Sequence, residues 1–418
     1  MSDSRELAGL FQESIELVST WLFDETVTLS SIATGADEES DGDVLDLFLS
    51  EIRARHALAC AATLPDILKS IEQRASTRPR IKHTVAKDLG HGRLDIGRYV
   101  QNRPAYGYRQ AKYPILEVYH SAQTPENVLV AQVLKQFAYQ LGGSPFPRNK
   151  AEGRDAALYH TWARGKLKRW PWDSIQAHGD VQWLRVQTEQ RLLRRRTGND
   201  AAYAAFLQWL SEWLFDPARM HGAPGEKFTK GLLAFPTGDF FWNRVLEIWC
   251  LKITAESLSR LGYQKVYGPL PLQERGKQAL YEFIKGDETL SIWFQRQKPM
   301  GSPRWQYASG RALAGIPDVL VHSTKRAPFI IDAKHKLITT DTRSDETYKM
   351  LGYLENFRHM YTADSFHCAL IMSGKHLIHN NLYSDKGDVL TLIGVTEKMS
   401  DRSKIEEYLD NALASWLA

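Results

Sequence analysis

The first half of the chain shows the apolar spacing of helices. Apolar residues recur there every three or four positions, which is the period of an amphipathic helix. This spacing predicts helices over residues 6–23, 44–73 and 124–137. Thr124 suits the N-cap of the third helix, and Pro125 suits its first position.

Three stretches interrupt this helical pattern. Glycines and acidic residues at 34–43 predict a loop, and residues 216–238 predict a turn-rich connector. Residues 82–118 contain short strand-like runs that are broken by glycines and by Pro104. The first half is therefore expected to be a mostly helical α+β region.

The second half alternates helical and strand-like patterns. Helices are predicted over residues 240–261, 346–360 and 403–417, and strands over 263–266, 290–295, 319–322, 329–331 and 369–372. Such alternation predicts an α/β domain in which helices flank a mixed sheet. We therefore divide the chain into an accessory region (1–145), a helical segment (146–235) and a C-terminal α/β domain (236–418).

The middle segment is basic, although the net charge of the whole chain is only +4. Residues 148–196 hold twelve lysines and arginines against five acidic residues. This excess suits contact with a nucleic-acid backbone, but a solvated helix face explains it nearly as well. Packing between helices is the first interpretation of the nearby tryptophans, and stacking on unpaired bases is the second. These tryptophans are Trp162, Trp170, Trp172, Trp183, Trp209 and Trp213.

The cysteines and the hydropathy pattern bear on the compartment. The three cysteines are widely spaced, so the sequence supports neither a disulfide framework nor a cysteine zinc site. No apolar run approaches the roughly 18 residues of a membrane span, and the N-terminus does not resemble a signal peptide. We expect a soluble protein of the cytoplasm.

Candidate chemistry lies in two acidic residues that flank a predicted hairpin. Asp318 follows Pro317 at the start of one strand, and Asp332 ends the next strand. In an antiparallel hairpin these positions lie side by side, so both carboxylates can bind one cation. Lys334 returns to the same face two residues later. Oxygen ligands of this kind suit Mg²⁺, with Mn²⁺ as a substitute. The competing interpretation is a pair of surface acids beside a solvated lysine.

Three further residues are candidates for the same site. Glu247 lies in the apolar run of the helix predicted at 240–261, where an acid needs a cation or a partner. A salt bridge to Arg244 is the alternative, and Glu256 is a weaker candidate on the same helix. Lys349 and Tyr353, four residues apart, share a helix face that could meet a phosphate or simply pack.

The Pro317-Asp318 and Asp332-Ala333-Lys334 pattern resembles the PD-(D/E)XK nuclease superfamily, and more narrowly its McrC-type subunits and related standalone restriction nucleases. Residues 124–130 are similar to the "TPEN" segment of their accessory region, and residues 246–250 resemble their "YE-x-WC" helix. The resemblance covers about residues 60–140 and 240–375. The sequence departs from the pattern at Leu246, where a tyrosine is usual, and at Lys349, where many relatives carry a glutamine.

This resemblance implies a restriction-endonuclease-like fold and a Mg²⁺-dependent DNA endonuclease of a prokaryotic restriction or anti-phage system. It implies Asp318, Asp332 and Glu247 as metal ligands and Lys334 as the catalytic lysine. McrC-type nucleases work with a separate nucleotide-driven motor, and this sequence contains no phosphate-binding loop of its own. The sequence is also compatible with a homo-oligomer of this chain.

Two other functions remain as alternatives. The chain could be a non-cleaving, DNA-binding scaffold subunit of a defence complex, although the intact Asp318, Asp332 and Lys334 set argues against a degenerate site. It could instead be a structure-specific repair nuclease.

Overall fold

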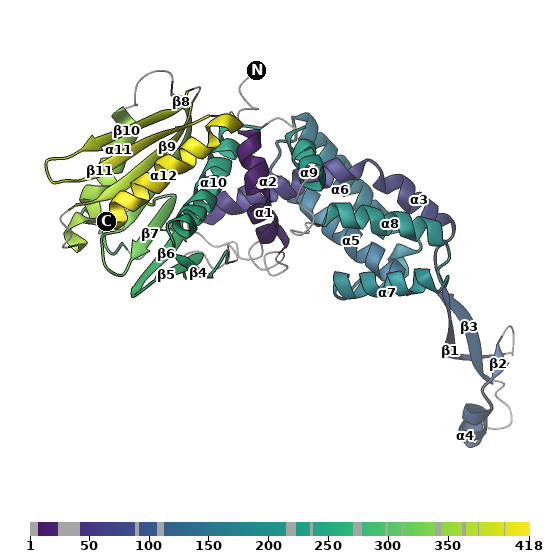
Figure 1. Cartoon of the computed structure of the whole chain (residues 1–418). Coiled ribbons are helices and arrows are strands. Elements are labelled where there is room, and N and C mark those ends of the chain that lie inside the picture. The colour runs from purple at the N-terminus through teal and green to yellow at the C-terminus, as the bar shows by residue number, and fades with distance from the viewer. Residues whose placement is uncertain are drawn as a thin grey trace. The chain divides into compact units, whose positions relative to one another are not determined.

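The computed structural model divides the chain into two compact units (Figure 1). One unit contains Met1–Ile52 and Phe215–Ala418, and the other contains Arg53–Leu214. The predicted three-part division of the sequence stays a prediction, because the units divide the chain by contacts rather than by composition. The residues that the structure describes are 7–23, 42–87, 92–106, 113–214, 223–234, 237–270, 278–296, 300–310, 313, 315–338, 344–361, 365–374, 376–396 and 398–418.

The unit Arg53–Leu214 is a helical bundle with a small antiparallel sheet. Helix α2 (Gly42–Ala61) crosses the boundary between the units. The other helices of the bundle are α3 (Leu64–Gln73), α5 (Pro125–Gly142), α6 (Ala151–Leu167), α7 (Val181–Leu193) and α8 (Asp200–Trp213), with a short 3₁₀ helix at Trp172–Ser174. The sheet has the order β1 (Arg78–Ala86), β3 (Tyr113–Ser121), β2 (Arg93–Leu94), and α4 (Ile96–Tyr106) follows β2. Figure 1 shows this sheet and α4 projecting from the bundle.

The start of α5 connects several parts of this bundle. Asn127 is fully buried and donates to the carbonyls of Ser76 and Ala122, both at 2.8 Å, while its own oxygen accepts from the hydroxyl of Tyr203 at 2.5 Å. Glu126 is also fully buried and accepts two hydrogen bonds from Arg191, at 2.8 and 3.1 Å. The polar residues at 126 and 127 therefore hold neighbouring elements together.

The other unit is built on an eight-stranded mixed sheet. Its strands are β4 (Gln264–Tyr267), β5 (Tyr281–Lys285), β6 (Glu288–Phe294), β7 (Val319–Ser323), β8 (Phe329–Ile338), β9 (His367–Gly374), β10 (Ile378–Tyr383) and β11 (Val389–Val395). The order across the sheet is β10-β11-β9-β8-β7-β6-β5-β4. Strand β9 is parallel to both β8 and β11, and the other neighbouring strands are antiparallel. The predicted α/β class with a mixed sheet is confirmed.

Helices cover both faces of this sheet, as the alternation of side chains requires. The helices of the unit are α1 (Ala8–Phe23), α9 (Ala223–Leu233), α10 (Asp239–Arg260), α11 (Ser344–Phe357) and α12 (Arg402–Leu417), with short 3₁₀ turns at Arg358–Met360 and Met399–Asp401. Val319 and Ile331 belong to the core beneath α1, α10 and α12. Leu320 and Ile330 belong to the core beneath α11. The even-numbered residues of β7, and those of β8 as far as Lys334, therefore face α11.

Several predictions from the sequence are wrong in detail. The helix predicted over 44–73 is two helices, α2 and α3, because a turn at 62–63 precedes Pro65 near the start of α3. The strand-like region 82–118 contains helix α4, and the connector 216–238 contains helix α9. Residues 34–41 of the predicted loop lie outside the described residues. None of the described helices has the length and apolar character needed to cross a membrane.

The tryptophans of the middle segment differ in burial, and Trp162 is half-buried. Trp172, Trp209 and Trp213 are buried between helices, as the first interpretation predicted. Trp170 and Trp183 are more than half exposed, so packing does not explain these two. Part of the basic charge is paired within the unit, because Lys166 contacts Glu72. Contact of this segment with nucleic acid stays a prediction.

Candidate active site

The hairpin of β7 and β8 places the two predicted aspartates side by side. Val319 is paired with Ile331 in the antiparallel register, so the next step places Asp318 opposite Asp332. The backbone N–H of Ala333 donates to Asp318 Oδ2 at 2.7 Å, which fixes the Asp318 side chain across the two strands. The predicted convergence of the two carboxylates is thus present, on the face of the sheet that α11 covers.

Lys334 lies between these two carboxylates. Its Nζ is 3.3 Å from Asp318 Oδ2 and 2.9 Å from Asp332 Oδ2, and it also donates to the carbonyl of Ala333 at 3.0 Å. Burial lowers the pKa of Lys334, but the charges of Asp318 and Asp332 outweigh this effect and hold the pKa above its ordinary value. Lys334 is therefore a fixed positive charge at the site.

Asp332 has the acceptor capacity that a cation site requires. Its side chain is 1 % exposed. Among the described residues Oδ1 has no hydrogen-bond donor, and Oδ2 has only the Lys334 ammonium at 2.9 Å. Burial and the neighbouring charge of Asp318 raise the pKa of Asp332 to about 7, against the effect of Lys334. One ammonium fills only part of the acceptor capacity of a buried carboxylate, and the rest is costly to leave empty unless a further cation or a proton compensates it. The donor set here fits a hard divalent cation.

Glu247 is near this site but is held by other partners. Its Oε2 accepts from Arg244 Nη1 at 2.5 Å and from Gln295 Nε2 at 2.7 Å, so the salt bridge considered from the sequence exists. Burial and the charge of Asp318 raise the pKa of Glu247, while Arg244 lowers it. Among the described residues no three His, Cys, Asp or Glu side chains are placed to hold one metal ion. A role for Glu247 at the cation stays a prediction.

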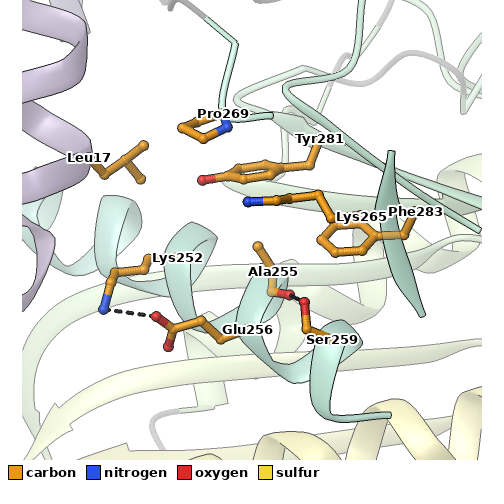
Figure 2. Close-up of a pocket in the computed structure, with 9 residues that line it drawn as sticks. All are labelled: Leu17, Lys252, Ala255, Glu256, Ser259, Lys265, Pro269, Tyr281 and Phe283. Carbon is orange, nitrogen blue, oxygen red and sulfur yellow. Dashed lines mark hydrogen bonds and ion pairs between the residues drawn. The ribbon is translucent and has the colours of Figure 1, made fainter. Parts of the chain in front are cut away.

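Glu256, the weaker candidate, lies in a different pocket. Figure 2 shows Glu256 and Lys252 among the side chains that line this pocket. The pocket has a volume of about 330 Å³, and Glu256 Oε1 is 2.9 Å from Lys252 Nζ. Tyr281 and Phe283 of β5 also line this pocket. Glu256 is therefore not part of the hairpin site.

Lys349 and Tyr353 of α11 do reach the hairpin site. Both line its cavity, and Lys349 Nζ lies 5.4 Å from the ring centroid of Tyr353. Burial lowers the pKa of Lys349, but the charge of Asp332 outweighs it, so the pKa is raised. The ring of Tyr353 lies directly against Gly315, where a β-carbon would be 2.0 Å from a ring atom. Lys349 and Tyr353 therefore share one face of α11, as the sequence predicted. Their contact with a phosphate stays a prediction.

The cavity at the hairpin has a volume of about 300 Å³ and is largely polar. Three of its residues, Arg244, Gln295 and Ile316, were not proposed from the sequence as parts of the site. Gln295 follows β6, the strand next to β7, and a polar residue at the end of that apolar strand was the available signal. The lining residues are Arg244, Gln295, Ile316, Asp318, Asp332, Lys334, Lys349 and Tyr353.

Comparisons with known proteins establish no family for this chain. No family model and no curated protein matches it. One solved structure that matches is a half-complex from a tetradecameric assembly of Thermococcus gammatolerans McrB AAA+ hexamers with bound McrC. The identity is 9 %, the TM-score is 0.32, and the match covers 97 % of this chain and 76 % of that chain. A TM-score this low does not establish a common fold, so the family resemblance rests on the motifs alone.

Proposed function

We propose that this chain is a metal-dependent deoxyribonuclease that hydrolyses phosphodiester bonds at the β7–β8 hairpin. One observation carries the proposal: Asp318 and Asp332 lie opposite each other with the Lys334 ammonium between them, and Lys334 is the one described cation within ion-pair distance of the buried Asp332 carboxylate. Two carboxylates and a fixed cation in one polar cavity suit the chemistry of a phosphate ester.

The carboxylates and the lysines of the cavity would have different roles. Asp318 and Asp332 would hold Mg²⁺, which commonly takes one or two carboxylates and keeps several waters. A bound Mg²⁺ polarises the phosphate and lowers the pKa of water beside it. Lys334 places a positive charge where negative charge develops on the phosphoryl oxygens. Lys349 adds a second cation at the cavity wall, within reach of a phosphate group.

The biological setting is a separate part of this proposal. The similarity of residues 124–130 and 246–250 to segments of McrC-type chains supports a role in a prokaryotic restriction or anti-phage system. In such a system a separate motor NTPase would be the partner, and the chain itself would carry the cutting site. DNA is the substrate that this resemblance favours.

A plasmid-nicking assay tests the catalytic proposal. Wild type, Asp332→Ala and the control Glu256→Ala are incubated with supercoiled plasmid and Mg²⁺, with and without any motor NTPase that the neighbouring genes encode. We expect wild type and Glu256→Ala to convert supercoiled plasmid to nicked or linear forms. The Asp332→Ala substitution, or added EDTA, should stop this conversion. If wild type and Asp332→Ala leave the plasmid equally intact under every condition, the chain is not a nuclease of this kind.

A further inference from the structure

Gln295 has an unusual backbone conformation next to the candidate active site. It follows β6 directly, and its φ of 48° lies in the left-handed region that residues other than glycine rarely adopt. Its N–H donates to the backbone carbonyl of Asp318 at 2.8 Å, so the β6–β7 pairing extends to the first metal-binding candidate. A strained conformation of this kind persists where the surroundings hold it, and it is common at functional sites.

The side chain of Gln295 is turned into the cavity with its oxygen unpaired. The residue is 5 % exposed and lines the cavity, and its Oε1 accepts no hydrogen bond from any described residue. Its Nε2 donates to Glu247 Oε2, which also accepts from Arg244. The amide nitrogen therefore faces Glu247, 2.7 Å from its Oε2, and the amide oxygen faces away from it.

Two buried side chains of one cavity, Asp332 and Gln295, therefore have acceptor capacity that no described donor fills. Asp332 has only the Lys334 ammonium, 2.9 Å from its Oδ2, and Gln295 Oε1 has no donor among the described residues. An unpaired buried acceptor destabilises the fold, and an amide with a purely structural role would be expected to satisfy both of its ends. A divalent cation with its water molecules supplies what both side chains lack. Glutamine oxygens are among the ligands that such cations accept.

We propose that the side-chain oxygen of Gln295 is a further protein ligand of the cation that Asp318 and Asp332 hold, bound directly or through one water molecule. In this arrangement Glu247 and Arg244 act as positioning residues that fix the direction of the Gln295 amide. The inference rests on the proposed metal-dependent function, and it assigns the third oxygen of the site to a neutral group rather than to a third carboxylate.

The test measures Mn²⁺ binding by the full chain without DNA, by calorimetric titration. Gln295→Leu removes the oxygen, and Gln295→Gly removes it while also relieving the positive φ, which keeps the test valid if the leucine variant folds poorly. Gln295→Glu keeps an oxygen at the same place. Glu256→Gln, on α10 but in the other pocket, is the matched control, and thermal unfolding in EDTA monitors the fold of every variant.

We expect Gln295→Leu and Gln295→Gly to weaken Mn²⁺ binding on the order of 10-fold or more, and Gln295→Glu and Glu256→Gln to bind at least as tightly as wild type. Wild-type affinity in a folded Gln295→Gly variant would overturn the inference. Equal weakening in Gln295→Glu would also overturn it, because the side chain would then act only through Glu247. A wild-type chain that binds no Mn²⁺ up to millimolar concentrations would overturn it as well.

These outcomes are separable from the failure of the nuclease proposal. A wild type that binds Mn²⁺ through Gln295 but leaves plasmid intact would support Gln295 as a metal ligand and contradict the nuclease proposal. A wild type that cuts plasmid while Gln295→Gly binds Mn²⁺ normally would support the nuclease proposal and contradict Gln295 as a metal ligand.

Discussion

Replacing Gly315 by alanine tests how firmly Tyr353 is held beside the cavity. A β-carbon at residue 315 would lie 2.0 Å from Cε1 and 2.1 Å from Cδ1 of Tyr353. Carbon atoms in contact are normally about 3.5–4.0 Å apart, so the ring must move by roughly 1.5 Å. Forcing an extra methyl group into packed surroundings typically costs about 1–3 kcal/mol.

The alanine itself brings no strain to the backbone, because Gly315 does not have a left-handed φ. At such positions Gly→Ala stabilises a protein by about 0.4–1 kcal/mol through the unfolded chain. The whole cost of Gly315→Ala therefore comes from the ring of Tyr353. In a Tyr353→Ala background the same substitution should be neutral or slightly stabilising, which gives a coupling free energy of about 1.5–4 kcal/mol.

Urea unfolding of wild type, the two single variants and the double variant measures this coupling. The transition of the unit that holds residues 215–418 should shift, and that of Arg53–Leu214 should stay in place. An equal loss from Gly315→Ala in both backgrounds would refute the contact with Tyr353 and the position of α11 at the cavity.

Three other substitutions or conditions have expected outcomes. Asn127→Ala should lower the free energy of unfolding of the Arg53–Leu214 unit by about 3 kcal/mol in urea, because it leaves buried partners unpaired; a loss under about 1 kcal/mol would contradict this. Burial lowers the pKa of His56 from 6.5 to about 4. The buried neutral imidazole therefore stabilises the fold above pH 6.5, and up to about 3 kcal/mol of this stability is lost as the pH falls toward 4. His56→Gln should flatten the curve of unfolding free energy against pH in this range, and an unchanged curve would contradict the assignment. Lys334→Met should slow plasmid cleavage at least about 100-fold with the fold intact, and an unchanged rate would exclude a catalytic lysine.

The central part of the candidate site could be predicted because it is local in sequence. Asp318, Asp332 and Lys334 lie on one hairpin, and the period of two along a strand fixes which side chains share a face. A short turn leaves little freedom of register, so the opposition of the two aspartates follows from the apolar runs beside them. Asn127, by contrast, is buried by partners from α8 and from the residues before β1, which no local pattern indicates.

The rest of the site depends on contacts between distant elements. Gln295 enters it because β6 pairs with β7, and Arg244 enters it from α10. Strand order and helix placement are tertiary properties that periodicity does not contain. Strand β11 was missed for a related reason, since its continuous apolar run is compatible with a buried helix or a buried strand. Strand β5 was missed because Glu282 and Lys285 dilute its pattern.

The place of the hairpin in the sheet has a consequence for regulation. Strands β7 and β8 are the two middle strands of the eight, with three neighbours on either side. Backbone amides in such strands exchange with solvent mainly through global opening of the unit, whereas surface helices open locally. The spacing of Asp318 and Asp332 is thus as durable as the unit itself. If the proposed activity is regulated within the folded unit, we expect the change at α11, by withdrawal of Lys349 and Tyr353, and amide exchange should then be fastest there.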